Sequence, residues 1–424
     1  MMATSMIELA WRSLRNRSTS ALLTVLAIAL SVALFLGVDK ARTSVRTSFD
    51  NTISGTHLIV GAPTGQINLL LYSVFRLGNA TAQIPWEAYV ALSEREDVAW
   101  AIPVSLGDSH RGYRVLGTSE AYFDHYQYGR KQFLSLAEGE HMHDLFDAVI
   151  GAEVARKLGY KLGDAMVLTH GLGAGGISDH DHRPFRVAGI LKPTGTPVDR
   201  TIHVTLEGVT AMHVGWETGA HNPLADHIHE DTLREFDLTP REVTAVFIGL
   251  TNDGRSLLRT QREINTNKQT PLLAIAPGIA LAELWQILGS AERILLAVSA
   301  FVIAVGLVSI LTSILTSLNE RRREMSILRA VGARPGHILT LLVSEAGVLG
   351  LAGAILGTVL IQLILAIAAP ILSSRFGIAL EATGPGLIDL WTILAVTVAA
   401  TLLGIWPAIL ALRRSLADGL TIKV

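Results

Sequence analysis

The chain has 424 residues, of which 50% are hydrophobic and 17% are charged, and its formal net charge is −2. This composition excludes an intrinsically disordered chain, and the nearly neutral charge does not indicate nucleic-acid binding, so no nucleic-acid partner is expected. The sequence contains no cysteine, which excludes disulfides and thiolate-bound metals and is compatible with an oxidising compartment.

Residues 1–17 are predicted to form an amphipathic helix at the cytoplasmic face of a membrane. Ile7, Trp11 and Leu14 share one face at helical spacing, and charged residues occupy the other. The apolar run 18–38 follows. It is longer than a signal-peptide core, and the segment after it offers no small-residue cleavage site. We therefore expect an uncleaved membrane anchor over the alternative of a cleaved signal peptide.

Four segments of the chain are nearly free of charge. A helix needs about 20 apolar residues to cross a hydrocarbon core of about 30 Å, and each of the four meets that length. The predicted spans are residues 18–38, 286–318, 338–369 and 390–412. The third run exceeds one crossing, so we expect Pro370 to end its helix and residues 370–389 to form a short loop.

The short connections differ in their content of basic residues. Lys and Arg are frequent before the first span, in residues 319–337 and in the tail 413–424, but the loop 370–389 holds only Arg375. Because basic residues resist translocation, both termini and the loop 319–337 are expected in the cytoplasm. The large segment 39–285 is then extracytoplasmic, which agrees with an even number of spans.

Both ends of the large segment continue the helical pattern of the neighbouring spans. Val38, Val45 and Phe49 form an apolar stripe after the first span, and Leu281, Leu284 and Leu288 form another before the second. The stripes predict a stalk of two helices that extend beyond the bilayer and pack together. The alternative is a pair of ordinary surface helices.

The segment between these helices mixes strand and helix signals. Short β-branched or aromatic runs bounded by turn residues predict strands at 56–60, 113–117, 185–190, 201–205 and 245–250. Helices are predicted at 85–95, 148–158 and 254–266. The expected fold class is therefore a membrane protein with four transmembrane helices and a large α+β extracytoplasmic domain, in two subdomains, inserted between spans 1 and 2.

The cytoplasmic segment 319–337 reads as a short amphipathic helix. Glu320, Glu324 and Leu328 fall on one side together with Ile327, and Gly332 is expected to end the helix. Such a helix can be gripped by a soluble partner. The alternative is a solvated loop that only fixes the topology.

The pattern E-R-R-R-E-x-x-x-L-R-A-x-G-A in this segment resembles the coupling helix of the ABC permease family that includes MacB, LolC/LolE and FtsX. Residues 8–38, 148–164, 185–199 and the ending Pro407-Ala408 to Arg413-Arg414 also resemble that family, so the likeness extends over nearly the whole chain. The sequence departs from the family in lacking a fused ATPase domain, and its tail is shorter.

The resemblance implies a permease subunit that works as a homodimer or with a related permease. Each coupling helix would contact a separate cytoplasmic ABC ATPase, and ATP hydrolysis there would move the stalks. The coupling positions are Glu320, Glu324, Ile327, Leu328, Arg329, Gly332 and Ala333. The chain has no G-x-x-x-x-G-K-[ST] loop, so it is expected to be no enzyme itself and to hold no ATP.

The family resemblance also implies a location and a range of functions. The chain would lie in a bacterial inner membrane with the domain 39–285 in the periplasm, in contact with membrane lipid and with a periplasmic protein or lipoprotein. It would export or mobilise an envelope substrate such as a lipoprotein, a lipid or a peptide. The alternative is an FtsX-like regulator of a periplasmic enzyme or protein. A link to metal homeostasis is a separate expectation, which rests on the histidines described below.

Thirteen of the fourteen histidines lie in the segment 39–285, and six of them form His-x-His pairs. The run Asp179-His180-Asp181-His182 is the strongest candidate metal site, since zinc favours imidazole and carboxylate ligands. The alternatives are solvated loop histidines or a pH-sensitive surface. A membrane-anchored metallohydrolase would need these loops, and a zinc channel would need ionisable groups in the spans, where only Glu345 qualifies.

Overall fold

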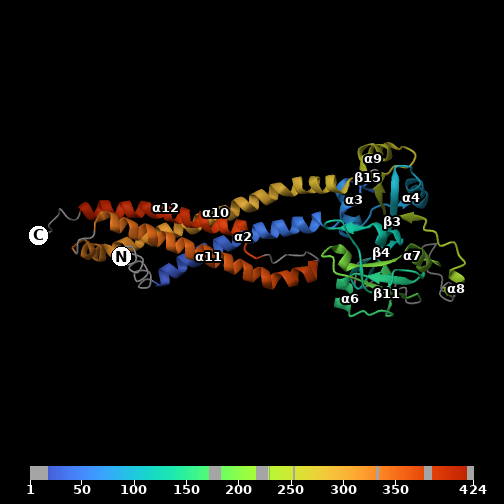
Figure 1. The fold of residues 1–424 in the computed structure, drawn as a ribbon, viewed down its shortest axis with the longest axis horizontal. Helices are drawn as coiled ribbons and strands as arrows, with labels where there is room; N and C mark the ends of the chain where they lie inside the picture. Colours follow the sequence, from blue (N-terminus) through green and yellow to red (C-terminus); the bar gives the residue numbers. More distant parts are fainter. Residues whose placement is uncertain are drawn as a thin grey trace. The chain divides into compact units, whose positions relative to one another are not determined.

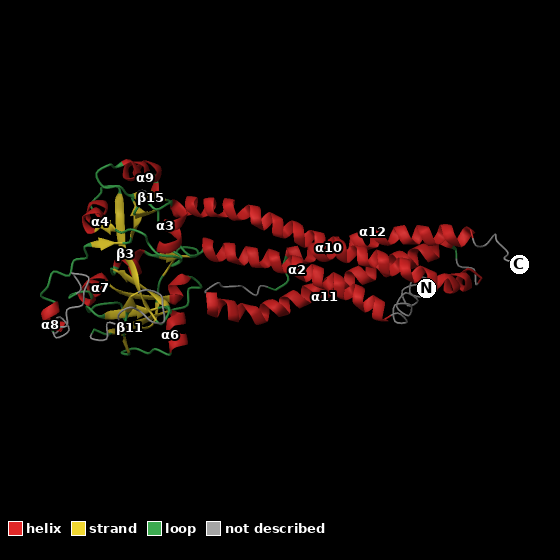
Figure 2. Ribbon diagram, turned by 180° about the vertical axis from the view of Figure 1, so that it is seen from behind, coloured by secondary structure: helices red, strands yellow, loops and turns green. Residues whose placement is uncertain are grey.

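The computed structural model describes residues 18–170, 183–215, 228, 230–251, 254–330, 334–376 and 384–417. It separates into two compact units. One, the helical unit, is built from long helices, and the other is the domain Val45–Leu288, which we call the inserted domain. The strands drawn in Figure 2 belong to the inserted domain. The predicted amphipathic helix at residues 1–17 lies outside the described residues.

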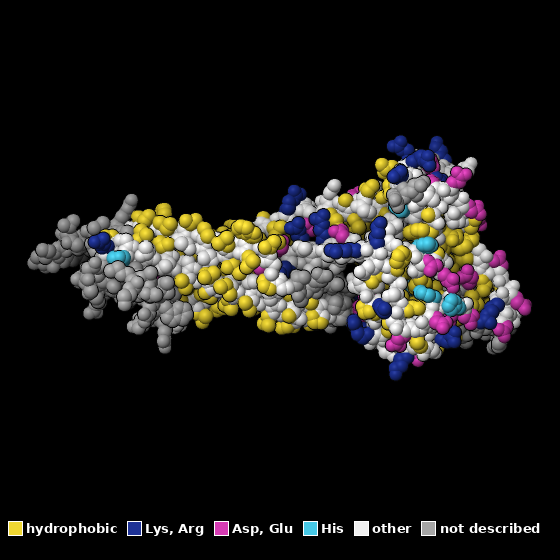
Figure 3. All heavy atoms as spheres, in the orientation of Figure 1, with side chains coloured by type: hydrophobic (Ala, Val, Ile, Leu, Met, Phe, Trp, Pro, Cys, Tyr) yellow, Lys and Arg dark blue, Asp and Glu magenta, His cyan; other side chains and the backbone are white. Residues whose placement is uncertain are grey.

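Four long helices carry the membrane spans (Figure 1). They are α2 (Ser18–Asp50), α10 (Pro277–Ala330), α11 (Pro335–Phe376) and α12 (Leu387–Ala417). Each contains a stretch long and apolar enough to cross a membrane. Hydrophobic side chains cover most of the described surface of the helical unit in Figure 3, as expected for helices that face lipid. The predicted fold class, four membrane helices with an α+β domain between the first and second, is confirmed.

Helix α11 packs against both α2 and α12 because its glycines let the backbones approach. A Cβ atom placed on Gly353 would lie 2.6 Å from Ile28 Cβ of α2, and one on Gly350 would lie 2.4 Å from Ala400 Cβ of α12. Within lipid, helices associate through close packing of this kind, since lipid tails are as apolar as the side chains. The glycines therefore place α11 between its two neighbours.

Pro370 does not end the third membrane helix, contrary to the sequence prediction. Helix α11 continues past it to Phe376, and α12 begins at Leu387. A proline lacks the N–H that would bond to the carbonyl four residues earlier, but membrane helices tolerate it because neighbouring helices and side chains satisfy the freed backbone groups. Residues 370–376 and 387–389, which were predicted to lie in a loop, are therefore helical.

The inserted domain is built on one mixed sheet of eleven strands in the order β15-β1-β14-β3-β4-β12-β8-β11-β7, with β10 paired to β3 and β9 to β11. Strand β12 runs parallel to β4, and β8 runs parallel to β11. The other pairings are antiparallel. The strands are β1 (Leu58–Gly61), β3 (Val98–His110), β4 (Tyr113–Thr118), β7 (Leu136–Gly139), β8 (Asp147–Ile150), β9 (Ala165–Met166), β10 (Thr169–His170), β11 (Phe185–Leu191), β12 (Thr201–Thr205), β14 (Ala245–Leu250) and β15 (Leu273–Ile275).

Shorter elements complete the inserted domain. Two small sheets pair β2 (Ile84–Pro85) with β13 (Glu242–Val243), and β5 (Gln127–Tyr128) with β6 (Gln132–Phe133). The helices are α3 (Gln66–Ser73), α4 (Trp86–Ser93), α5 (Ala121–His125), α6 (Ala152–Leu158), the 3-10 turn η1 (Pro197–Arg200), α7 (Leu206–Met212), α8 (Glu230–Leu233) and α9 (Leu257–Thr266).

The continuous sheet differs from the prediction of two subdomains, although its buried side chains form three separate clusters. One predicted helix is also partly wrong. Ala148, Val149 and Ile150 belong to β8 and are fully buried, and the helix α6 begins only after Gly151. Pairing with β11 and β12 on both sides decides the conformation here, since strand preference depends on such neighbours.

Candidate functional site

The predicted coupling segment continues the second membrane helix. Helix α10 is unbroken from Pro277 to Ala330, so Glu320, Glu324, Ile327, Leu328 and Arg329 all lie on helical backbone. The orientation of their side chains lies outside the described residues, as do Gly332 and Ala333 altogether. The backbone alone places Glu320, Glu324 and Leu328 on one face, because residues four apart on a helix are neighbours.

Helix α10, at 54 residues, contributes to both units. Helix α2 does so too, since it belongs to the helical unit up to Ser44 and to the inserted domain from Val45, and the last residues of α11, from Leu372, are grouped with the inserted domain. Helix α10 begins directly after β15, the last strand of the inserted domain, and its helical backbone continues to the coupling segment.

The ends of these two helices contact each other inside the inserted domain. The rings of Phe49 and Trp285 lie 5.7 Å apart between centroids, and the Arg46 guanidinium lies 5.7 Å from the centroid of Trp285. Trp285 Nε1 donates a hydrogen bond of 3.1 Å to Asp50 Oδ1. Phe49 also stacks on Phe75 at 4.2 Å, which attaches the helix pair to the segment after α3. Phe49 belongs to one of the apolar stripes that predicted a stalk, and the stalk itself stays a prediction.

Two ion pairs tie α2 to its neighbours within the helical unit. Lys40 Nζ lies 3.0 Å from Asp389 Oδ2 of α12, and the Asp389 side chain is only 1% exposed. Arg42 Nε lies 2.8 Å from Glu292 Oε2 of α10. Asp389 lies in the first turn of α12, and its Oδ2 also accepts a hydrogen bond from the backbone N–H of Gly386, the residue just before this helix. Sequence reasoning missed these pairs, although charges that border an apolar run are a signal to look for partners.

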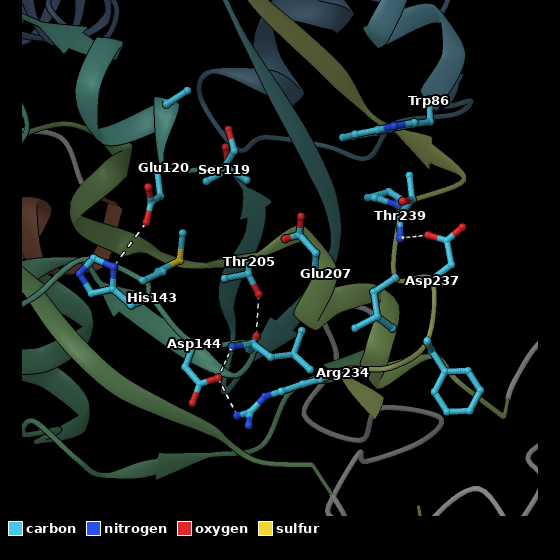
Figure 4. Close-up of a pocket in the computed structure, with 17 residues that line it drawn as sticks. Trp86, Ser119, Glu120, His143, Asp144, Thr205, Glu207, Arg234, Asp237 and Thr239 are labelled. Carbon is cyan, nitrogen blue, oxygen red and sulfur yellow. Dashed lines mark hydrogen bonds and ion pairs between the residues drawn. The ribbon is translucent and has the colours of Figure 1, made fainter. Parts of the chain in front are cut away.

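A cavity of about 830 Å³ opens on the inserted domain between the end of β4, residues 142–145 and residues 234–240 (Figure 4). Four carboxylates line it, and one of them, Asp144, is paired with Arg234 at 2.7 Å. His143 Nδ1 lies 3.5 Å from Oε1 of Glu120, another carboxylate of the lining. The lining has an excess of negative charge, so the cavity favours cationic over anionic groups.

Of the three His-x-His pairs, only His141 and His143 lie within the described residues. The candidate ligands Asp179, His180, Asp181 and His182 lie outside the described residues. His141 packs against Phe123, with 4.9 Å between ring centroids, whereas His143 faces Glu120. Among the described residues, no group of three or more His, Asp or Glu side chains is arranged to hold a metal ion. The zinc site at residues 179–182 stays a prediction.

Two family descriptions match this chain. The MacB-like periplasmic core domain matches residues 21–265, which is more than half of the chain, and the FtsX-like permease C-terminal domain matches residues 296–416. A stretch of 74 residues is 40% identical to an uncharacterised ABC transporter permease of Methanocaldococcus jannaschii, and it covers 18% of this chain and 18% of that protein. The match thus spans about a fifth of the relative's length.

A solved structure is also similar. The crystal structure of the periplasmic region of MacB from Actinobacillus actinomycetemcomitans aligns with 55% of this chain and 94% of that chain, at 11% sequence identity and a TM-score of 0.33.

Proposed function

Because this chain belongs to the MacB/FtsX family of ABC transporter permeases, we propose that it transmits motion from a cytoplasmic ATPase to the inserted domain. The transmitted motion exports or mobilises an envelope substrate of the lipoprotein, lipid or peptide class. In this proposal the termini and the coupling segment are cytoplasmic, and the inserted domain is periplasmic.

One observation carries the proposal: the coupling segment and the inserted domain share one unbroken helix. Backbone hydrogen bonds run along the whole of α10, so a tilt or shift imposed at residues 320–330 need not dissipate in a loop. Its first turns contact the last turn of α2 through Trp285 and Phe49. A displacement of α10 would therefore be passed to the second helix that enters the inserted domain.

The coupling position most sensitive to charge is Glu324. We expect Glu324→Lys to lower the ATP hydrolysis rate of the reconstituted complex about tenfold or more, because reversing a charge at a partner contact costs several times RT. The assay uses the full chain in lipid nanodiscs with the ATPase subunit encoded beside it, and hydrolysis is measured with and without the permease.

A matched control is available on the same helix. Glu283 is exposed and belongs to the part of α10 in the inserted domain, so Glu283→Lys makes the same charge change away from the coupling segment. It should retain the wild-type rate. If the two variants behave alike, residues 320–330 are not the ATPase contact, and the proposed coupling to a cytoplasmic ATPase is refuted.

Helix α10 also presents a regular apolar stripe that the single chain leaves uncovered. Ile294, Val298, Phe301, Val305 and Val308 are between 53% and 70% exposed. Their spacing alternates between four and three residues, the pattern of a two-helix seam. We propose that two copies of the chain pair along this stripe, which brings two coupling segments to two ATPase subunits.

Pairing along α10 predicts a specific cross-link. The chain has no cysteine, so Phe301→Cys introduces the only thiol. In membranes treated with a mild oxidant, this variant should form a disulfide-linked dimer in high yield, because residues at one level of a seam face each other. Leu402→Cys, on an exposed face of α12 at 60% exposure, is the matched control and should stay monomeric. Equal cross-linking of both variants would indicate random collision.

A further inference from the structure

Arg76, just after helix α3, is a buried cation with no counterion among the residues that the structure describes. Its side chain is 9% exposed. One guanidinium nitrogen, Nη2, donates to the Tyr122 hydroxyl over 3.4 Å, whereas Nε and Nη1 are buried and have no hydrogen-bond partner among the described residues. A buried charge is normally paired, since leaving its donors unsatisfied costs free energy. The two unpaired donors therefore favour a hydrogen-bond acceptor that carries negative charge.

The backbone at Arg76 adds a second unfavourable feature at the same residue. Its φ is +59°, in the left-handed region that favours glycine, and Leu77 N donates to Leu71 O over 3.0 Å on the far side of this turn. A glycine here would relieve the backbone and remove the unpaired charge. Both the positive φ and the buried, unpaired charge are unfavourable, which indicates a functional role for the arginine side chain.

The surroundings of Arg76 contain a second cation. Burial and the proximity of Arg76 lower the pKa of Arg114, whose Nη2 donates to Gly78 O and Asn79 Oδ1. Burial raises the pKa of Tyr122, so this phenol stays protonated and carries no charge. Burial likewise lowers the pKa of His203 to about 3, so its ring is neutral at physiological pH. These three neighbours of Arg76 thus supply positive charge and no negative charge.

We propose that Arg76 binds an oxyanion, the carboxylate or phosphate group of a ligand, through the two nitrogens that have no partner in the protein. Arg114 contributes the second positive charge. The ligand enters past residues 77–79, which are exposed and which Arg114 holds through its two hydrogen bonds. The chemistry is that of a free anion or of an anionic lipid headgroup, both of which present the same oxygens.

The position of this site connects it to the helix pair that leaves the inserted domain. Tyr122 stacks on Tyr126 at 4.7 Å, and Tyr126 Oη donates to Thr52 O, two residues after α2 ends. On its other side, Arg76 follows Phe75, which stacks on Phe49 of α2. A bound anion would therefore stabilise the arrangement at the end of α2. Its effect on ATP hydrolysis rests on the proposed function, whereas its binding does not.

The test measures anion binding by the purified full chain, without any ATPase. The midpoint of thermal unfolding is followed in detergent as phosphate or acetate is added, with chloride at the same ionic strength as the reference. Wild type should show a saturable rise of several degrees with phosphate or acetate over chloride. Arg76→Gly should fold at least as well as wild type without anion and should lose that rise. An equal rise in chloride would overturn the proposal.

The chain offers a close control for Arg76→Gly. Arg111 is also an arginine with positive φ, at +49°, but its side chain is exposed in the turn between β3 and β4. Arg111→Gly relieves a similar backbone and should keep the full anion response. A response that survives in Arg76→Gly refutes the site. A further arm compares nanodiscs of anionic and zwitterionic lipid: stabilisation by anionic lipid that depends on Arg76 supports the site and identifies a headgroup as the source.

Discussion

Replacing Lys40 by methionine is expected to destabilise the helical unit by roughly 3–5 kcal/mol, because it leaves a buried carboxylate without its cation. The Asp389 side chain is 1% exposed, and its Oδ1 atom already lacks a hydrogen-bond partner among the described residues. Removing the contact of 3.0 Å to Lys40 Nζ leaves the backbone N–H of Gly386 as the remaining partner of Oδ2. We expect the variant to show a much lower apparent unfolding temperature in detergent.

Removing the charge of Asp389 instead of the charge of Lys40 should destabilise the helical unit less. Lys40 is 17% exposed and has a flexible stem, so in Asp389→Asn its ammonium group can reach water or lipid headgroups. The asparagine oxygen also keeps an acceptor for Gly386 N–H. The double variant Lys40→Met/Asp389→Asn should recover most of the stability lost in Lys40→Met, since it removes the unpaired charge.

The second ion pair of α2 provides the comparison. Arg42 and Glu292 are 34% and 20% exposed, so solvent screens their contact, and Arg42→Met is expected to cost about 1 kcal/mol or less. Unfolding midpoints of all four variants, taken at one detergent concentration, give the ranking. Equal losses for Lys40→Met and Arg42→Met would show that burial of Asp389 does not set the cost.

The spans were predictable from the sequence because the requirement for about 20 apolar residues is local. The Lys40–Asp389 pair was not, since its partners are separated by 349 positions and nothing near either residue names the other. Pro370 was misjudged for a related reason: whether a membrane helix continues past a proline depends on neighbouring groups that satisfy the freed backbone carbonyl, and these are distant in sequence.

The candidate sites also differ in how far they could be predicted from the sequence. The coupling segment has a local helical pattern, and its backbone is helical to Ala330 as expected, whereas the contact of its side chains with an ATPase stays a prediction. Spacing drew attention to the His-x-His pairs. Arg76 and His203 have no such pattern, and their burial is seen only in the structure.

His203 should make the inserted domain less stable in mild acid. Its ring is completely buried on β12, with Nδ1 3.0 Å from Val149 O, and burial lowers its pKa to about 3 from the usual 6.5. As the pH falls below 6.5, the unfolded chain takes up a proton that the folded chain refuses until about pH 3, so folding stability is lost over this window. Between pH 7 and pH 5 the loss amounts to about 2 kcal/mol.

The substitution His203→Gln isolates this contribution, because glutamine keeps a hydrogen-bond donor for Val149 O and does not titrate. Hydrogen exchange of the β8 and β12 amides in the full chain, corrected for intrinsic rates, gives the opening free energy at each pH. The variant should lose less stability than wild type between pH 7 and pH 5, by about 2 kcal/mol. His143→Gln removes a side chain that is 64% exposed and should retain the wild-type slope. If His203→Gln also retains that slope, other groups cause the acid sensitivity, and the buried imidazole must gain its proton together with a local opening of the strands.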